Sequence, residues 1–133
     1  MATGLENLKI YQMAKELEMR IHGLTGKFPK EEKYRSIDQL KRSSSSVTNN
    51  IAEAYYKKSV KEKTHILRDM SITEGEETRS NVLRSAEKGF LDSSIALEIS
   101  EAYITLRKAT YGYIKFLKVF SEKTENSLNS KTD

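Results

Sequence analysis

The sequence contains no cysteine and no tryptophan, and only one proline and six glycines among 133 residues. The absence of cysteine excludes a disulfide scaffold and thiolate metal sites, and it fits a cytoplasmic protein. Little proline and glycine excludes collagen-like and low-complexity classes. No apolar run exceeds about four residues, against the ~20 that span a bilayer. The first seven residues have neither a basic start nor an apolar core, so no signal peptide is expected.

The net charge of +4 conceals large blocks of opposite sign. Residues 27–63 hold ten basic and five acidic side chains, and residues 102–123 hold five basic and one acidic. Residues 69–101 instead hold three basic and eight acidic side chains. Basic blocks suit phosphate or an acidic protein, and the acidic block could pair with a basic one in a neighbouring subunit.

Apolar residues recur at steps of three and four in four segments, a spacing typical of amphipathic helices. The predicted helices cover residues 6–24, 31–57, 60–88 and 92–121. The third has the weakest apolar stripe, made of Ile66, Met70, Thr73, Glu77 and Leu83 or Ala86. Its start is well marked, because Ser59 and Glu62 have the spacing of a capping box.

Four long helices with short connections predict an all-α fold, an antiparallel up-down four-helix bundle. No strand-like alternation competes with this pattern. The bundle domain should comprise residues 1–121. Residues 122–133 have little apolar content beyond Leu128, which predicts a disordered C-terminal tail.

The predicted second helix carries a second, polar stripe at steps of three and four. Its members are Gln39, Arg42, Ser46, Asn50, Glu53 and Lys57. Most bundle helices have a solvated polar face, and spacing alone favours that interpretation. The alternative is a polar interface, because amides beside Arg and Glu suit directional hydrogen bonds.

Basic side chains form the candidate nucleic-acid-binding surface. They are Lys27, Lys30, Lys41, Arg42, Lys57, Lys58, Lys61 and Lys63. In an antiparallel bundle the first and second interhelical connections lie at opposite ends, which predicts two patches joined along the second helix. Lysine and arginine contacts with phosphate give salt-dependent affinity without sequence preference.

Signals for catalysis and cofactors are weak. The pair Glu62 and His65 has the spacing of half a di-iron site, but the sequence offers no second such pair. No phosphate-binding glycine loop is present, so no cofactor and no enzymatic activity are expected. The acidic cluster Glu74, Glu76 and Glu77 surrounds Gly75, and it is interpreted either as a solvated face beside a close helix crossing or as a cation-binding or interface patch.

Residues 39–62 resemble the hallmark segment of the four-helix-bundle 23S-rRNA intervening-sequence proteins. The family pattern is roughly Q-L-R-R-A, then S-I-x-x-N-I-A-E-G, then a basic pair and S-x-K-E. It matches this sequence at Gln39, Leu40, Arg42, Ser46, Val47, Asn50, Ile51, Ala52, Glu53, Lys57, Lys58, Ser59, Lys61 and Glu62. Thr48 stands where many members have proline or a small residue, and Ala54 stands where they have glycine. The usual glycine-serine pair of the third helix is replaced by Ile72-Thr73.

The resemblance implies a four-helix protomer that assembles into a ring-like homo-oligomer, a pentamer. Members are often encoded inside inserts of 23S rRNA genes. A protein of similar fold is a basic pentamer that associates with nucleic acid and a reverse transcriptase. The resemblance therefore implies RNA or DNA and a nucleic-acid enzyme as partners. No membrane partner is expected. Three hypotheses follow: a non-enzymatic oligomer associated with nucleic acid, an oligomeric protein-interaction scaffold without a nucleic-acid role, and a metal enzyme, which a metal bound at His65 would support.

Overall fold

The computed structural model describes the backbone of residues 4–132 and the side chains of residues 4–124. The first long helix is α1 (Lys9–Thr25), and a short turn η1 (Leu5–Asn7) precedes it. A short turn η2 (Lys30–Glu32) and a π-helical turn η3 (Lys33–Ile37) lead into α2 (Asp38–Tyr56). The third long helix is continuous through α3 (Val60–His65), the π-helical η4 (Ile66–Ser71) and α4 (Ile72–Glu87). The fourth is α5 (Ser93–Thr132).

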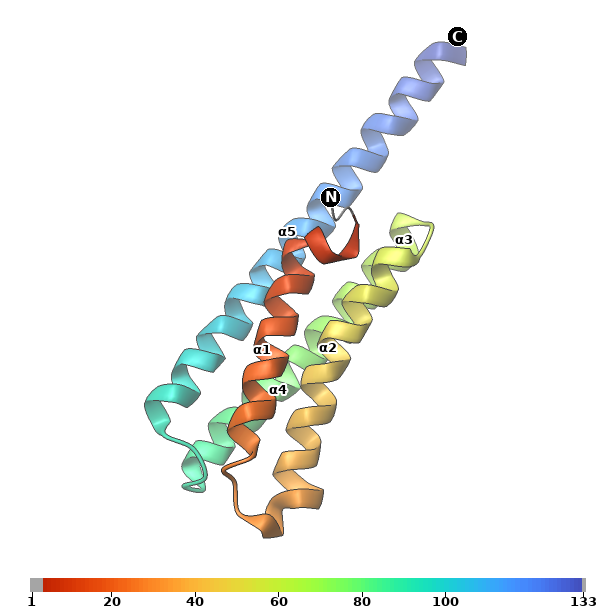
Figure 1. Cartoon of the computed structure of the whole chain (residues 1–133). Helices are drawn as coiled ribbons and strands as arrows, with labels where there is room; N and C mark the ends of the chain where they lie inside the picture. Colours follow the sequence, from red (N-terminus) through yellow and green to blue (C-terminus); the bar gives the residue numbers. More distant parts are fainter. Residues whose placement is uncertain (1–3, 133) are drawn as a thin grey trace.

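The four long helices alternate in direction, so the predicted antiparallel bundle is confirmed (Figure 1). The connection from α1 to α2 and the connection from α4 to α5 lie at one end of the bundle, and the turn between α2 and α3 lies at the other. None of the described residues belongs to a β-strand. Within residues 4–132, no helical stretch has the length and hydrophobicity that crossing a bilayer requires.

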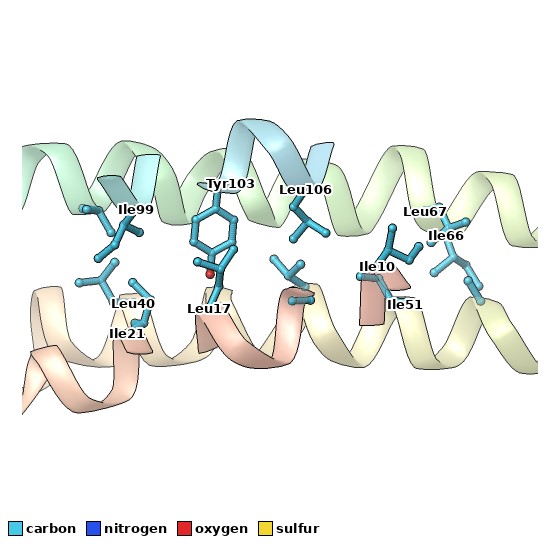
Figure 2. Close-up of a cluster of buried hydrophobic side chains, with 14 of the residues drawn as sticks. Ile10, Leu17, Ile21, Leu40, Ile51, Ile66, Leu67, Ile99, Tyr103 and Leu106 are labelled. Atoms are coloured by element: carbon cyan, nitrogen blue, oxygen red, sulfur yellow. The ribbon is translucent and has the colours of Figure 1, made fainter. Parts of the chain in front are cut away.

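The core forms where the predicted apolar stripes of the helices pack against one another. Ile10, Leu17 and Ile21 of α1 face Leu40 and Ile51 of α2, and all five are buried. Opposite them, α5 contributes Ile99, Tyr103 and Leu106 (Figure 2). Each fully buried aliphatic side chain contributes about 1.5–3 kcal/mol by transfer from water, so this line of contacts holds the bundle together.

Small polar side chains, rather than large apolar ones, line the contact between α2 and α4. The hydroxyl of Ser71 donates a 3.1 Å hydrogen bond to the Val47 carbonyl, and the hydroxyls of Ser43 and Thr78 lie 2.7 Å apart. All three hydroxyl residues are almost completely buried. Gly75 lies in the same row, where a Cβ would be 3.9 Å from Val47 and 3.7 Å from Tyr103. We call this contact the hydroxyl seam.

The predicted stripe of the third helix is wrong from Met70 to Glu77. Met70 is 40% exposed and Thr73 is exposed, whereas Leu67 and Ser71 are buried. The reason is the π-helical turn η4, which accommodates an extra residue and rotates the buried face relative to α3. The true buried row continues through Thr78, Val82 and Ser85.

The second long helix also differs from its prediction at its start. Arg35 has non-helical angles (φ −124°, ψ −107°), so α2 proper begins at Asp38. The Glu32 carboxylate accepts hydrogen bonds from the backbone N–H and the hydroxyl of Ser36, which competes with regular helix geometry there.

Helix α5 continues past the predicted end at residue 121 to Thr132. Residues 122–132 contain no proline or glycine, so nothing in the chain interrupts the helix. Among the described side chains of α5, Ile114 is the last buried apolar one, Leu117 still packs against the core, and the C-terminal part of the helix projects beyond the bundle (Figure 1). Part of the predicted tail therefore has helical backbone, while residue 133 and the side chains after 124 lie outside the described residues.

Candidate nucleic-acid interface

The basic residues that the sequence singles out occupy two ends of the bundle. Lys27 and Lys30 lie between α1 and α2, with Lys41 one turn into α2. Lys57, Lys58, Lys61 and Lys63 lie at the α2–α3 turn at the far end (Figure 1). We name these sets the α1–α2 patch and the α2–α3 patch.

At the α1–α2 patch, a shallow hollow of about 330 Å³ brings together Lys30, Lys33 and Lys41 around Phe28. Acidic residues lie in the same segment, including Glu32, whose pKa is lowered because Ser36 donates two hydrogen bonds to its carboxylate. The positive charge of this patch is therefore partly offset by its own chain.

Two residues of the α2–α3 patch have structural partners. The Lys63 ammonium donates hydrogen bonds to the carbonyls of Ala54 (3.2 Å) and Tyr55 (2.7 Å), which closes the C-terminus of α2. Burial lowers the pKa of Lys63. Lys57 lies 3.8 Å from Glu53. Lys63 therefore caps the C-terminus of α2.

The same turn is held by the predicted capping box. The backbone N–H of Glu62 donates to the Ser59 hydroxyl (3.1 Å), and that hydroxyl donates to the Glu62 carboxylate (3.0 Å). This arrangement directs Lys58 and Lys61 outward, and both side chains are exposed.

The polar stripe of α2 is only partly engaged. Arg42 reaches Glu77 of α4 at 3.0 Å, while Ser46 and Asn50 are half-buried and Gln39 and Glu53 are exposed. Arg42 therefore ties α2 to α4, while its side chain remains 55% exposed.

The acidic cluster divides into two environments. Burial and the neighbouring Glu77 raise the pKa of Glu74. Glu76 instead faces α5 and accepts hydrogen bonds from Arg79 (2.9 Å) and Arg107 (2.6 Å). Burial alone would raise the pKa of Glu76, but the two guanidinium groups outweigh it and hold that pKa below its usual value. The cluster is thus a cross-link between α4 and α5 as well as a surface charge.

A model of the 23S rRNA-intervening sequence protein family matches residues 6–112. The chain belongs to this family. A similar solved structure is that of a protein with unknown function from the S23 ribosomal protein family of Bacteroides thetaiotaomicron, with 18% sequence identity and a TM-score of 0.70. That similarity covers 80% of this chain and 98% of the other, and it shows the fold. A search of curated proteins found no match.

In this intervening-sequence protein, His65 and Glu62 are each hydrogen-bonded to another side chain. His65 Nδ1 lies 2.8 Å from an Asp69 carboxylate oxygen, and the Glu62 carboxylate is engaged by Ser59. Within the described part of the chain, no three His, Asp or Glu side chains converge as metal ligands would.

This intervening-sequence protein has a basic groove near the α2–α3 turn that was not predicted from the sequence. The groove lies between the α3–η4 segment and α5, and it is lined by Val60, Lys61, Thr64, His65, Arg68 and Lys118. Only Lys61 was among the predicted residues. The recurrence of Lys61, Thr64, His65 and Arg68 at steps of three, one and three could have indicated a shared helix face, but nothing local places Lys118 beside it.

Proposed function

We propose that this protein is a non-enzymatic, cytoplasmic homo-oligomer that associates with RNA or another nucleic acid through its basic ends. The observation that carries the proposal is the α2–α3 patch, where Lys58 and Lys61 project outward beside the exposed ring of Tyr56. Tyr56 is 71% exposed, and exposed aromatic rings beside lysines suit stacking on bases and contact with phosphates.

An uncovered aromatic stripe on α5 supports self-association. Phe116 and Phe120 are 59% and 61% exposed, and their rings stack at 6.0 Å between centroids. Val119 adds to the exposed apolar surface of the same helix. Large exposed apolar side chains in one place mark interaction sites, and we infer that a second copy covers this stripe in a ring of five subunits.

The nucleic-acid role is tested by measuring affinity for structured rRNA fragments at several salt concentrations. Affinity should fall steeply with salt, and the double variant Lys57→Glu, Lys58→Glu should weaken it at least tenfold, because two phosphate-binding charges are reversed. A matched reversal of two exposed lysines on α1, Lys9→Glu and Lys15→Glu, should cause a much smaller loss. Equal losses in the two variants would mean that only net charge matters.

The second candidate is an oligomeric protein-interaction scaffold, which the uncovered aromatic stripe favours. Light scattering tests self-association, which both candidate functions require. A mass of 15.2 kDa at micromolar concentration would be that of a monomer and would contradict the oligomer. If the oligomer forms but rRNA fragments do not bind even at low salt, the scaffold is the better account.

A further inference from the structure

We propose that the groove between the α3–η4 segment and α5 is a binding site for phosphate groups of a nucleic-acid strand. This inference rests on the proposed nucleic-acid function and states where the strand lies. The groove has a volume of about 430 Å³ and opens to solvent at the α2–α3 end. Lys118 lies beyond residue 112, so one wall of the groove is outside the part of the chain that the family model matches.

Positive charge stands on both walls of the groove. Lys61 and Arg68 come from the α3–η4 wall, and Lys118 comes from α5. Lys61 and Arg68 are seven residues apart, which is about 10 Å along a helix. Successive phosphates of one strand are about 3.4 Å apart along a duplex axis, so this wall is long enough for more than one phosphate group.

Thr64 supplies a hydrogen-bonding group in the same place. It lies between Lys61 and Arg68 on the helix, lines the groove and is only 6% exposed. Its hydroxyl oxygen is buried and has no hydrogen-bond partner among the described residues. A buried polar group without a partner is unfavourable, and a phosphate oxygen at the groove floor would accept the hydrogen bond of this hydroxyl.

Asp69 orients the cationic side of the groove. Its carboxylate accepts hydrogen bonds from Arg68 Nε (3.1 Å) and Nη2 (3.4 Å) and lies 2.8 Å from His65 Nδ1. These contacts leave Arg68 Nη1 to face a ligand. The single negative charge of Asp69 is outweighed by the positive charges of Lys61, Arg68 and Lys118, so the groove is positive. His65 is a further hydrogen-bonding group there.

Tyr111 extends the site along α5. It is seven residues, or about two turns, before Lys118, so the two side chains share a face of the helix. The side chain of Tyr111 is 48% exposed. Its half-exposed ring can stack on a base whose phosphate contacts Arg68.

Other buried polar atoms do not form a comparable site. Among the described side chains, Glu74 and Tyr103 also have buried atoms without partners. Tyr103 lies inside the apolar core between α1 and α5 (Figure 2), and Glu74 lies beside Glu77, where an anion would be repelled. At Thr64, in contrast, the buried hydroxyl lies in a groove that is lined by cationic side chains from two helices.

The test measures binding of the full-length protein to a labelled single-stranded RNA and to DNA of the same sequence, at about 50 and 200 mM salt. The double variant Lys61→Gln, Lys118→Gln should lose roughly tenfold in affinity for the strand that binds more tightly. Its log–log salt slope should fall by about 1.4, since each lost phosphate contact on a single strand contributes about 0.7. The control Lys9→Gln, Lys15→Gln removes the same charge from α1 and should change affinity less than about twofold.

Thr64→Val keeps the side-chain shape and removes the hydroxyl, and it should weaken binding several-fold without lowering the melting temperature. If the wild type binds but the groove variant loses no more than the α1 control, the groove assignment is wrong and the proposed function stands. If the wild type binds neither strand at low salt, both the proposed function and the groove assignment are wrong.

Discussion

The hydroxyls of Ser43 and Thr78 lie 2.7 Å apart between α2 and α4, and both side chains are completely buried. Thr78 Oγ1 is also 2.9 Å from the Glu74 carbonyl, so Thr78 can donate to that carbonyl while Ser43 donates to Thr78. Neither hydroxyl can turn to water, so each depends on the other within the hydroxyl seam.

Thr78→Val should lower the free energy of unfolding by about 1–3 kcal/mol, because it leaves the Ser43 hydroxyl buried without a partner. Ser43→Ala in the same chain should recover part of that loss. Urea unfolding of the two single variants and the double variant measures the coupling. Additive losses would show that the two hydroxyls do not interact.

Gly75→Ala should be tolerated and should raise the free energy of unfolding by up to about 1 kcal/mol, the helix-propensity difference between the two residues. The added Cβ would meet Tyr103 and Val47 at ordinary contact distances of 3.7 and 3.9 Å. Gly75→Leu should instead destabilise by about 1–3 kcal/mol through overpacking. Thermal unfolding compares the two, and a destabilised alanine variant would contradict the spacing described.

Glu76→Gln should lower the free energy of unfolding by about 1 kcal/mol at neutral pH, because the partly exposed ion pairs with Arg79 and Arg107 are lost. The pKa of Glu76 is lowered in the folded state, so its stabilisation is present above the ordinary value of 4.5 and is lost as the pH falls through the folded pKa. The difference between wild type and variant should therefore shrink in acid. Glu87→Gln, an exposed change on the same helix, is the control and should show no such convergence.

Thr64→Val should leave the unfolding free energy of the ligand-free protein unchanged or raise it slightly, because the hydroxyl that it removes has no partner. Thr78→Val is the matched comparison, since it removes a buried hydroxyl that is hydrogen-bonded. Chemical denaturation of both variants gives the contrast. A loss at position 64 as large as that at position 78 would mean that the Thr64 hydroxyl is satisfied within the protein.

The four helices could be predicted because each buries a stripe of apolar side chains, and the Ser59–Glu62 cap is a local signal. The phase of the third helix could not, because the π-helical turn at Ile66–Ser71 shifts the buried face without any marker residue. Serine and threonine at the hydroxyl seam were also missed as core residues, since hydropathy assigns them to the surface.

The candidate site shows the same division between local and long-range information. The positions of Lys58 and Lys61 beside a turn follow from the sequence. The partner of Arg42 and the approach of Lys118 to Arg68 depend on how helices far apart in the chain meet, and the partners of Lys63 depend on how the chain turns between α2 and α3. Charge composition alone therefore could not separate structural cations from those that face solvent.

The hydroxyl seam also sets the axial alignment of α2 and α4. Sliding one helix along the other by one turn, about 5.4 Å, would remove Ser71 from the Val47 carbonyl and Thr78 from Ser43 at once. An apolar seam would permit such a shift with little change in buried area. These hydroxyls therefore fix the axial position of η4 and α4, and with η4 the position of Arg68, relative to α2.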